Sequence, residues 1–397
     1  MKKIIYITEQ FPYPPDSGGK IKTLNTLNTL SKKYQVHLIS FSPQQIKIEN
    51  ENYLKRILTS STVIVDKTIN DHVKDNKNKL IRNYLKGVPY LIFQYQNQEA
   101  TQKINKLIKK INPTAIHIDH LNMSQYLPAI KKCAWVFEEH NLESKLLWSR
   151  FICTKHLKTK LFLLIETFLT KFYELKILSK FDVIFSISDH DKKILKKITP
   201  PTPVFTYLLP IEKKSLSNKV EPGNILFIGD LTWQPNYNAV KWFIKGVLPL
   251  IVSTHPKITL HLVGKFDETL ANYHGYSNTI FHGYQKNIQK FLKKADLFVM
   301  PFKIGEGIRI KTLIALSAGI PIVATSTGVK GLKLKPEHHF LLANNSLEFS
   351  RKISTLLTNK KLKAKLINNG YKYLLEQHSR KNNQQFLERY QKITREF

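Results

Sequence analysis

The chain is poor in the residues from which disulfide-stabilised and membrane-spanning proteins are built. Its 397 residues include two cysteines, which are too few for a disulfide framework or a cysteine metal site. No stretch reaches the roughly 20 consecutive apolar residues of a membrane span, because the longest candidate, residues 161–169, is interrupted by Glu166. The N-terminus lacks the long apolar region of a secretory signal peptide. We therefore expect a cytoplasmic, reduced protein.

Acidic residues are also scarce. The chain has 29 Asp and Glu against 62 Lys and Arg, a formal net charge of +33. Such a positive field attracts polyanions, including nucleotide diphosphates, anionic lipid and nucleic acid. Lys, Asn and Ile are all frequent, however, and AT-rich coding produces that composition without selection for charge. Because no recognisable nucleic-acid-binding motif accompanies the charge, we do not expect nucleic acid as a partner.

Strand-like runs alternate with helical patterns, which is typical of parallel sheets with helices on both faces. A first series of predicted strands comprises residues 4–7, 36–40, 61–65, 115–118, 134–137 and 183–186. A second series comprises residues 225–228, 259–263, 279–282, 297–301 and 321–324. The length allows two domains. We therefore predict an α/β chain of two doubly wound, Rossmann-like domains.

The segment between the two series, residues 198–224, is rich in proline and polar residues and predicts an interdomain linker. The predicted domains are residues 1–210 and 211–375, followed by a basic helical segment, 376–397. In open α/β sheets, ligands bind beyond the carboxyl ends of the strands. Because glycine loops follow strands in both domains, we expect both loops to face a cleft.

The most informative segment, residues 295–331, has the pattern of a strand, a glycine-flanked loop, an amphipathic helix, a turn and a strand. Gly305 and Gly307 flank a lone carboxylate, Glu306. The glycines allow a ligand to approach the backbone closely. A carboxylate repels phosphate but accepts hydrogen bonds from hydroxyls, as on a sugar.

Two cations, Arg309 and Lys311, follow in the first turn of the predicted helix. A helix N-terminus presents unpaired N–H groups and partial positive charge, so this position suits a phosphate. Gly18, Gly19 and Lys20 follow the first strand of the chain in a similar arrangement. A phosphate site beside a hydroxyl acceptor is what an enzyme acting on a nucleotide sugar needs.

Residues 295–331 resemble the donor loop of retaining glycosyltransferases of the GT-B fold, specifically family four. That family has a Glu-x7-Glu motif in which the first Glu contacts the donor sugar and the second the ribose. Glu306 matches the first position, whereas Ile314 replaces the second. The resemblance extends over nearly the whole chain and is greatest to a bacterial subgroup of exopolysaccharide and cell-wall sugar transferases. Further matching segments are residues 138–144, 181–191, 227–243 and 338–349.

The resemblance implies a division of labour between the two domains. Residues 1–210 would bind a glycan or lipid-linked acceptor, residues 211–375 would bind the nucleotide sugar, and residues 376–397 would return to the first domain. Transfer would retain the anomeric configuration, with the leaving phosphate acting as the base. Paired carboxylates are therefore not expected. Neither a metal ion nor a cofactor is expected, and the sequence shows no coherent cluster of metal ligands.

Individual roles follow from the same resemblance. Arg309 and Lys311 would stabilise the departing diphosphate, and Glu306 would hold the donor sugar. His120 would hydrogen-bond near the transferred sugar, with His140 as the alternative. The predicted donor-binding positions are Gly18, Gly19, Lys20, Gly229, Tyr284, Lys303, Gly305, Gly307 and Ile308. Many family members also have an Arg and a Lys after the first strand of the second domain, but residues 229–233 of this chain contain neither.

Several of these residues have plainer interpretations. The cations could belong to a solvated basic face, each histidine could be structural, and Tyr284 could fill the core. Asp189 and Asp191 resemble a metal pair, but they are better explained as caps of a helix that begins at Lys192.

Residues 156–180 form a basic amphipathic helix that could lie on an anionic membrane, at the inner face of which lipid-linked acceptors reside. We slightly favour an ordinary core helix with a cationic outer face. For the whole chain we predict a glycosyltransferase. The alternative is a degenerate relative that binds nucleotide or glycan without catalysis, and Ile314 is the residue that supports it.

Overall fold

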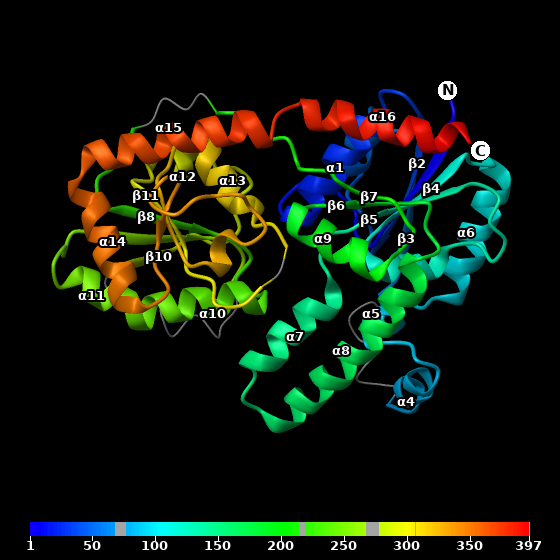
Figure 1. The fold of residues 1–397 in the computed structure, drawn as a ribbon, viewed down its shortest axis with the longest axis horizontal. Coiled ribbons are helices and arrows are strands. Elements are labelled where there is room, and N and C mark those ends of the chain that lie inside the picture. The colour runs from blue at the N-terminus through cyan, green and yellow to red at the C-terminus, as the bar shows by residue number, and fades with distance from the viewer. Residues whose placement is uncertain (68–76, 215–218, 267–277, 306, 397) are drawn as a thin grey trace. The chain divides into compact units, whose positions relative to one another are not determined.

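The computed structural model describes residues 1–67, 77–214, 219–266, 278–305 and 307–396. The chain divides into two compact units, each of which is a parallel sheet covered by helices (Figure 1). Unit 1 comprises residues 1–209 and 381–397, and unit 2 comprises residues 210–380. The predicted α/β class with two doubly wound domains is confirmed. Among the described residues, no helix is both long and apolar enough to cross a membrane.

Unit 1 has a seven-stranded sheet in the order β3-β2-β1-β4-β5-β6-β7, and all its pairings are parallel. The strands are β1 (Lys3–Thr8), β2 (Gln35–Ser42), β3 (Ser60–Val65), β4 (Ala115–Asp119), β5 (Ala134–Glu138), β6 (Val183–Ser186) and β7 (Val204–Thr206). Successive residues of β1 alternate between two cores, with Ile5 and Ile7 on one face and Ile4 and Tyr6 on the other. Burial on both faces explains why these strands are continuous apolar runs.

The helices of unit 1 cover both faces of this sheet. They are α1 (Gly18–Leu30), α2 (Ile48–Lys55), α4 (Lys77–Leu85), α5 (Tyr90–Phe93), α6 (Gln98–Ile111), η1 (Leu121–Tyr126), α7 (Glu143–Cys153), α8 (Leu157–Leu178), α9 (Asp189–Ile198) and α16 (Lys381–Arg395). Apolar residues of α1, α2 and α16 share one core with Ile4 and Tyr6. Those of α5, α6, α8 and α9 share the other core with Ile5 and Ile7.

Unit 2 has a six-stranded parallel sheet in the order β10-β9-β8-β11-β12-β13. Its strands are β8 (Asn224–Ile228), β9 (Thr259–Val263), β10 (Thr279–Phe281), β11 (Leu297–Met300), β12 (Ile322–Ala324) and β13 (Leu341–Leu342). Its helices are α10 (Gln234–Trp242), η2 (Phe243–Val247), α11 (Leu248–Val252), α12 (Gln289–Lys294), α13 (Ile310–Ser317), η4 (Thr327–Val329), α14 (Ser346–Thr358) and α15 (Lys360–Gln377).

The prediction of a linker over residues 198–224 was wrong in part. Strand β7 lies inside it and pairs with β6, with Ile184 opposite Val204. Pro200, Pro201 and Pro203 precede this strand, and β7 is the edge of the sheet, where proline is tolerated. The short strand β13 was not predicted, because two apolar residues carry almost no periodic signal.

Two further expected boundaries differ from the structure. The boundary expected after residue 375 falls inside α15, and unit 2 extends to Arg380 because His378 bonds back to the Ile211 backbone. The helix expected to start at Lys192 begins at Asp189. Its cap is Ser188, whose hydroxyl accepts from the Asp191 amide at 2.9 Å.

A buried ion pair joins α1 to the centre of the sheet in unit 1. Lys22 Nζ lies 2.6 Å from Glu138 Oε1, with side chains 3% and 0% exposed. Glu138 also accepts from Thr26 Oγ1 at 3.0 Å and from His117 Nε2 at 3.1 Å. Burial alone would raise the pKa of Glu138, but Lys22 and His117 hold it at about 2. The carboxylate therefore remains ionised in the interior.

Lys22→Met should destabilise unit 1 by about 3–5 kcal/mol, because it leaves the Glu138 charge buried without its partner. The double variant Lys22→Met/Glu138→Gln should recover much of the loss. Glu138 has a lowered pKa, so its stabilisation should be complete above its ordinary value of 4.5 and should disappear as the pH falls toward about 2. Denaturant unfolding of the three proteins measures both effects. Equal stability of the single variant and the parent would contradict this account.

Candidate functional site

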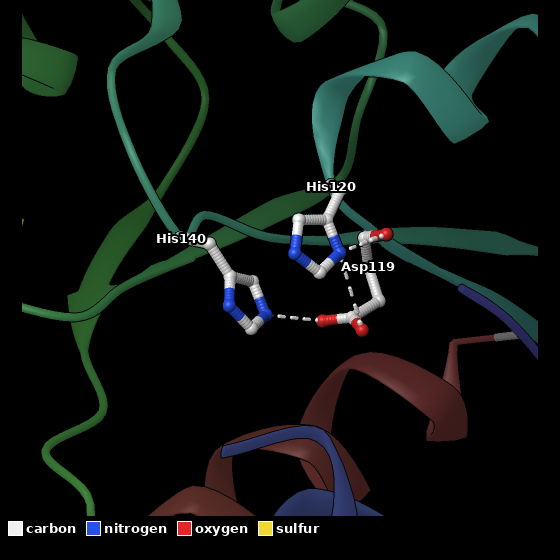
Figure 2. A group of neighbouring side chains, drawn as sticks. All are labelled: Asp119, His120 and His140. Carbon is white, nitrogen blue, oxygen red and sulfur yellow. Dashed lines mark hydrogen bonds and ion pairs between the residues drawn. The ribbon is translucent and has the colours of Figure 1, made fainter. Parts of the chain in front are cut away.

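The strand order of each sheet reverses at one point, and polar side chains gather at both points. In unit 1 the reversal lies between β1 and β4. Asp119 ends β4, His120 follows it, and His140 follows β5 closely. Figure 2 shows the two imidazoles next to each other and both bonded to Asp119, and their rings stack with centroids 3.9 Å apart. His140 Nε2 lies 2.5 Å from Asp119 Oδ1, and His120 Nδ1 donates to the Asp119 backbone oxygen at 2.8 Å.

The remaining nitrogens of both rings point toward the start of α1. A Cβ placed on Gly19 would lie 3.2 Å from Gln10 Nε2, 3.8 Å from His120 Nε2 and 3.9 Å from His140 Nδ1. Three polar side chains therefore converge on a glycine in the first turn of a helix, where backbone N–H groups are unpaired. This space suits an anion or the hydroxyl of a sugar.

Of the other predicted residues in this loop, Gly18 begins α1 and Lys20 lies one residue past Gly19. The hydroxyl of Ser17 caps the helix by accepting from the Lys20 amide. The Lys20 ammonium forms an ion pair with Asp16 at 2.9 Å. The structure thus brings Gly19, His120 and His140 together, whereas the Lys20 side chain is bonded to its own loop.

Interactions between the charged groups of this cluster keep Asp119 ionised and His120 protonated. Burial alone would raise the pKa of Asp119, but His140 and His120 hold it well below its usual range. Burial opposes the charged form of His120, yet Glu9 and Asp119 raise its pKa to about 10. His120 is therefore an imidazolium at neutral pH and can only donate hydrogen bonds.

Two further carboxyls near this cluster have unusual pKa values. Burial, followed by the charges of Glu174 and Glu9, raises the pKa of Glu143 to about 8. Burial also raises the pKa of Glu174 to about 7. Both groups can hold a proton near neutral pH, which is common at functional sites.

The expectation that no cluster of metal-ligating side chains exists was wrong. Ligand atoms of Asp119, His120 and His140 all lie within 4.8 Å of one another. These ligand atoms already have partners within the protein, however, because each histidine has one ring nitrogen bonded to Asp119. Thr23 Oγ1 also donates to Asp119 Oδ2 at 2.7 Å. A charged His120 offers no lone pair to a metal, so these residues suit an organic ligand better than a cation.

In unit 2 the strand order reverses between β8 and β11, where Gly229 follows β8. Lys311, from the first turn of α13, extends its ammonium to this loop and donates to Asn236 Oδ1 at 2.9 Å. A Cβ on Gly229 would lie only 2.5 Å from Lys311 Nζ, so a larger residue here would displace the ammonium. Lys311 thus provides a cation beside residues 229–233, which contain none of their own.

Burial and the neighbouring charge of Arg309 lower the pKa of Lys311 to about 7, against the opposing effect of Asp230. Arg309 is the N-cap residue of α13, one position earlier than the predicted first turn. Its guanidinium lies 4.7 Å from the Phe302 ring and donates to the Ile304 backbone oxygen at 3.2 Å.

Two glycines of the predicted donor loop have backbone conformations that favour glycine. Gly305 has φ +140° and Gly307 has φ +72°, conformations that other residues rarely adopt. A Cβ on Gly305 would overlap the Arg309 guanidinium. The guanidinium therefore packs against the loop that would approach a ligand. Glu306 itself lies outside the described residues.

The remaining predicted donor-binding residues are more dispersed. Lys303 directs its ammonium to the Asn344 backbone oxygen and over the Trp242 ring at 4.3 Å. Tyr284 is 46% exposed, so it does not fill the core. Ile308 is half-buried against the core of unit 2.

Ile314 also packs against this core, which gives an apolar side chain a structural role at the second motif position.

Residues 222–359 match the family described as "Glycosyl transferases group 1". This match covers only part of the chain. The matched residues lie wholly in unit 2 and include Gly229, Arg309 and Lys311. The candidate site of unit 2 therefore lies within the segment that matches this family.

Relatives cover the whole chain. The "Uncharacterized 44.6 kDa protein in cps region" of Klebsiella pneumoniae is 23% identical over 400 residues, 96% of this chain and 97% of its own. Sucrose-phosphate synthase of Thermosynechococcus elongatus has a TM-score of 0.74 at 13% identity, covering 100% of both chains. A TarM variant of S. aureus, solved with Fondaparinux, alpha-GlcNAc-glycerol and UDP, has a TM-score of 0.69 at 12% identity, covering 99% of this chain and 100% of that one. These structures show that the fold is GT-B, as predicted.

Sequence reasoning did not select Asp119, Glu9 or Asn236. Asp119 and Glu9 stand at the ends of strands β4 and β1, and that position was the signal available. Asn236 gave no such signal, because its contact with Lys311 joins residues 75 positions apart.

We predict that His120 titrates far above the ordinary histidine range, near pH 10, and that Glu9→Gln lowers this pKa by removing a nearby negative charge. Because folding raises the pKa of His120, its protonated form should stabilise the fold fully below pH 6.5. This stabilisation should disappear as the pH rises through about 10. NMR of labelled histidine measures the titration, with the signal assigned by its loss in His120→Gln. Glu212→Gln, an exposed change in unit 2, is the matched control. Titration of parental His120 near pH 6.5 would refute this assignment.

Proposed function

We propose that the protein transfers a sugar from a nucleotide-diphosphate sugar to a glycan or lipid-linked acceptor, with retention of the anomeric configuration. The observation that carries the proposal is the pair of cations at the reversal point of unit 2. Arg309 stands at the start of α13, and Lys311 extends from the same turn to Gly229. The TarM structure, which contains UDP, supports a nucleotide ligand for this fold.

The proposed chemistry needs positive charge where the leaving group departs. When the bond between the anomeric carbon and the diphosphate breaks, negative charge develops on the diphosphate oxygens. Lys311, Arg309 and the first amides of α13 lie together and would stabilise that charge. They are held in place before reaction, since Lys311 bonds to Asn236 and Arg309 to Ile304. We propose that the leaving phosphate itself accepts the acceptor's proton, without a metal ion or a cofactor.

Unit 1 would bind the acceptor and contact the transferred sugar. The imidazolium of His120 can donate to a sugar hydroxyl, and Asp119 fixes the orientation of both histidines. Gly19 leaves the space that such a ligand needs. Glu306 remains the proposed contact to the donor sugar.

A second candidate function is binding of nucleotide or glycan without transfer. Ile314 favours it, because an isoleucine packed on the core forms no hydrogen bond to a ribose. One measurement distinguishes the two functions. Transfer releases nucleoside diphosphate from a sugar nucleotide in the presence of acceptor, whereas binding alone does not. A thermal-shift panel of UDP-, GDP-, ADP- and CMP-sugars would first identify the donor, since a ligand at 100 times its Kd adds about 2.7 kcal/mol of stability.

Arg309→Ala should lower turnover more than tenfold, because loss of one donor to a developing charge typically costs about 2.7–4 kcal/mol. Turnover is measured as nucleoside diphosphate release, with EDTA present throughout. Lys257→Ala removes an exposed cation at the opposite end of β9 and should leave turnover unchanged. Unchanged turnover in a folded Arg309→Ala protein would remove Arg309 from the site. Absence of turnover by the parent, despite donor binding, would favour the binding function.

Affinity for a UDP-sugar should fall as the pH rises above about 7, because Lys311 then loses its charge. Linkage to one proton gives a decrease of up to about tenfold per pH unit. A UDP-sugar is the suitable probe, since its diphosphate has no secondary oxygen that titrates in this range. Calorimetry between pH 6 and 8.5 measures the effect, and Lys311→Met should bind weakly with little pH dependence. Constant parental affinity across this range would show that Lys311 does not contact the diphosphate.

A further inference from the structure

Helices α7 and α8 form a hairpin in which α8 buries acidic and hydroxyl side chains and exposes apolar ones. Figure 1 shows them extending side by side from the sheet of unit 1, and they pack against each other. Most of the buried residues of α8 are polar, and the full set is Leu163, Glu166, Thr167, Thr170, Glu174 and Leu178. Its exposed face carries an apolar stripe with helical spacing, consisting of Leu157, Leu161, Ile165, Phe168 and Phe172. A core helix normally shows the opposite arrangement, so α8 is not the ordinary core helix that we favoured, and its outer face is apolar as well as cationic.

The two buried glutamates fix the rotation of α8. Glu166 accepts from the Tyr90 amide at 2.9 and 3.1 Å. Glu174 accepts from the Ser144 amide at 3.2 Å and from the Ser144 hydroxyl at 2.5 Å. Turning the apolar stripe inward would break these bonds and leave polar groups without partners, which is costly. The apolar stripe is therefore held outward by the interior contacts.

Helix α7 enlarges the apolar surface. Trp148 and Ile152, one turn apart, are 45% and 60% exposed, while Leu157 and Phe172 at the two ends of the stripe are 82% and 66% exposed. Exposed apolar residues scattered singly need no explanation, but a contiguous patch indicates an interaction site. We call the set of Trp148, Ile152, Leu157, Leu161, Phe162, Ile165, Phe168 and Phe172 the hairpin patch.

The charges around the hairpin patch have one sign. Residues 143–180 contain three acids, of which Glu166 and Glu174 are buried and Glu143 is half-buried. The basic residues of the same segment are Lys145, Arg150, Lys155, Lys158, Lys160, Lys171, Lys176 and Lys180. Apolar side chains with basic neighbours are the combination with which an interfacial helix binds an anionic bilayer.

We propose that the hairpin patch docks unit 1 on an anionic lipid bilayer, with its apolar side chains among the acyl chains and its lysines at the headgroups. The charges favour a bilayer over a second copy of this chain. Pairing two hairpins would bring their basic residues together, and each chain has a net charge of +33. This surface is independent of the proposed reaction, so each can fail without the other.

The test is co-sedimentation of the full chain with vesicles of phosphatidylcholine, with and without phosphatidylglycerol. We expect binding to the mixed vesicles, weakened by salt, and little binding to phosphatidylcholine alone. Leu161→Ser/Phe168→Ser/Phe172→Ser should lower binding at least tenfold. The matched control, Ile48→Ser/Leu347→Ser/Leu375→Ser, changes equally exposed apolar residues elsewhere and should bind as the parent does. Circular dichroism confirms that both variants are folded.

A second measurement separates insertion from adsorption of a basic protein. Brominated lipid in the mixed vesicles should quench tryptophan fluorescence of the parent, and Trp148→Phe should remove most of the quenching. Equal vesicle binding by the two triple variants, or quenching unaffected by Trp148→Phe, would overturn the proposal. So would a parental dimer in sedimentation equilibrium that dissociates in the hairpin variant and does not bind vesicles.

Discussion

The reversal of strand order in each parallel sheet is the constraint on which the candidate site depends. At the reversal, neighbouring strands send their following loops in opposite directions, so polar groups can gather between them without being covered. In unit 1 this occurs between β1 and β4, where Glu9 and His120 emerge. In unit 2 it occurs between β8 and β11, where Gly229 meets Lys311. Both clusters therefore follow from the topology, and the side chains decide what each can bind.

Several of the chain's few acidic residues fix the packing of helices and side chains inside unit 1. Glu138 fixes α1 through Lys22, Asp119 orients two histidines, and Glu166 and Glu174 set the rotation of α8. A buried carboxylate without partners would be costly, so each of these contacts allows essentially one arrangement. Because Glu166 and Glu174 point inward, the fully exposed charges of the hairpin are all basic.

In unit 2, the cation beside the loop that follows β8 comes from a distant segment of the chain. Residues 229–233 contain neither the arginine nor the lysine that many similar enzymes have there. Lys311 reaches that loop from α13, and Gly229 leaves room for its ammonium. Comparison by sequence position alone would miss this cation, because Lys311 is distant from residues 229–233 in the sequence.

The sequence by itself determined the fold class, nearly all of the strands and the loops that carry the site, because continuous apolar runs and glycines at strand ends are local signals. It did not predict β7 or β13, whose edge positions and short lengths leave weak patterns. Tertiary structure alone decided that His120 and His140 belong to one cluster, and that Lys311 serves the loop at Gly229. It also decided which face of α8 points outward, since Glu166 and Glu174 bond to residues far along the chain. Such contacts depend on how the chain is packed, and no local pattern records them.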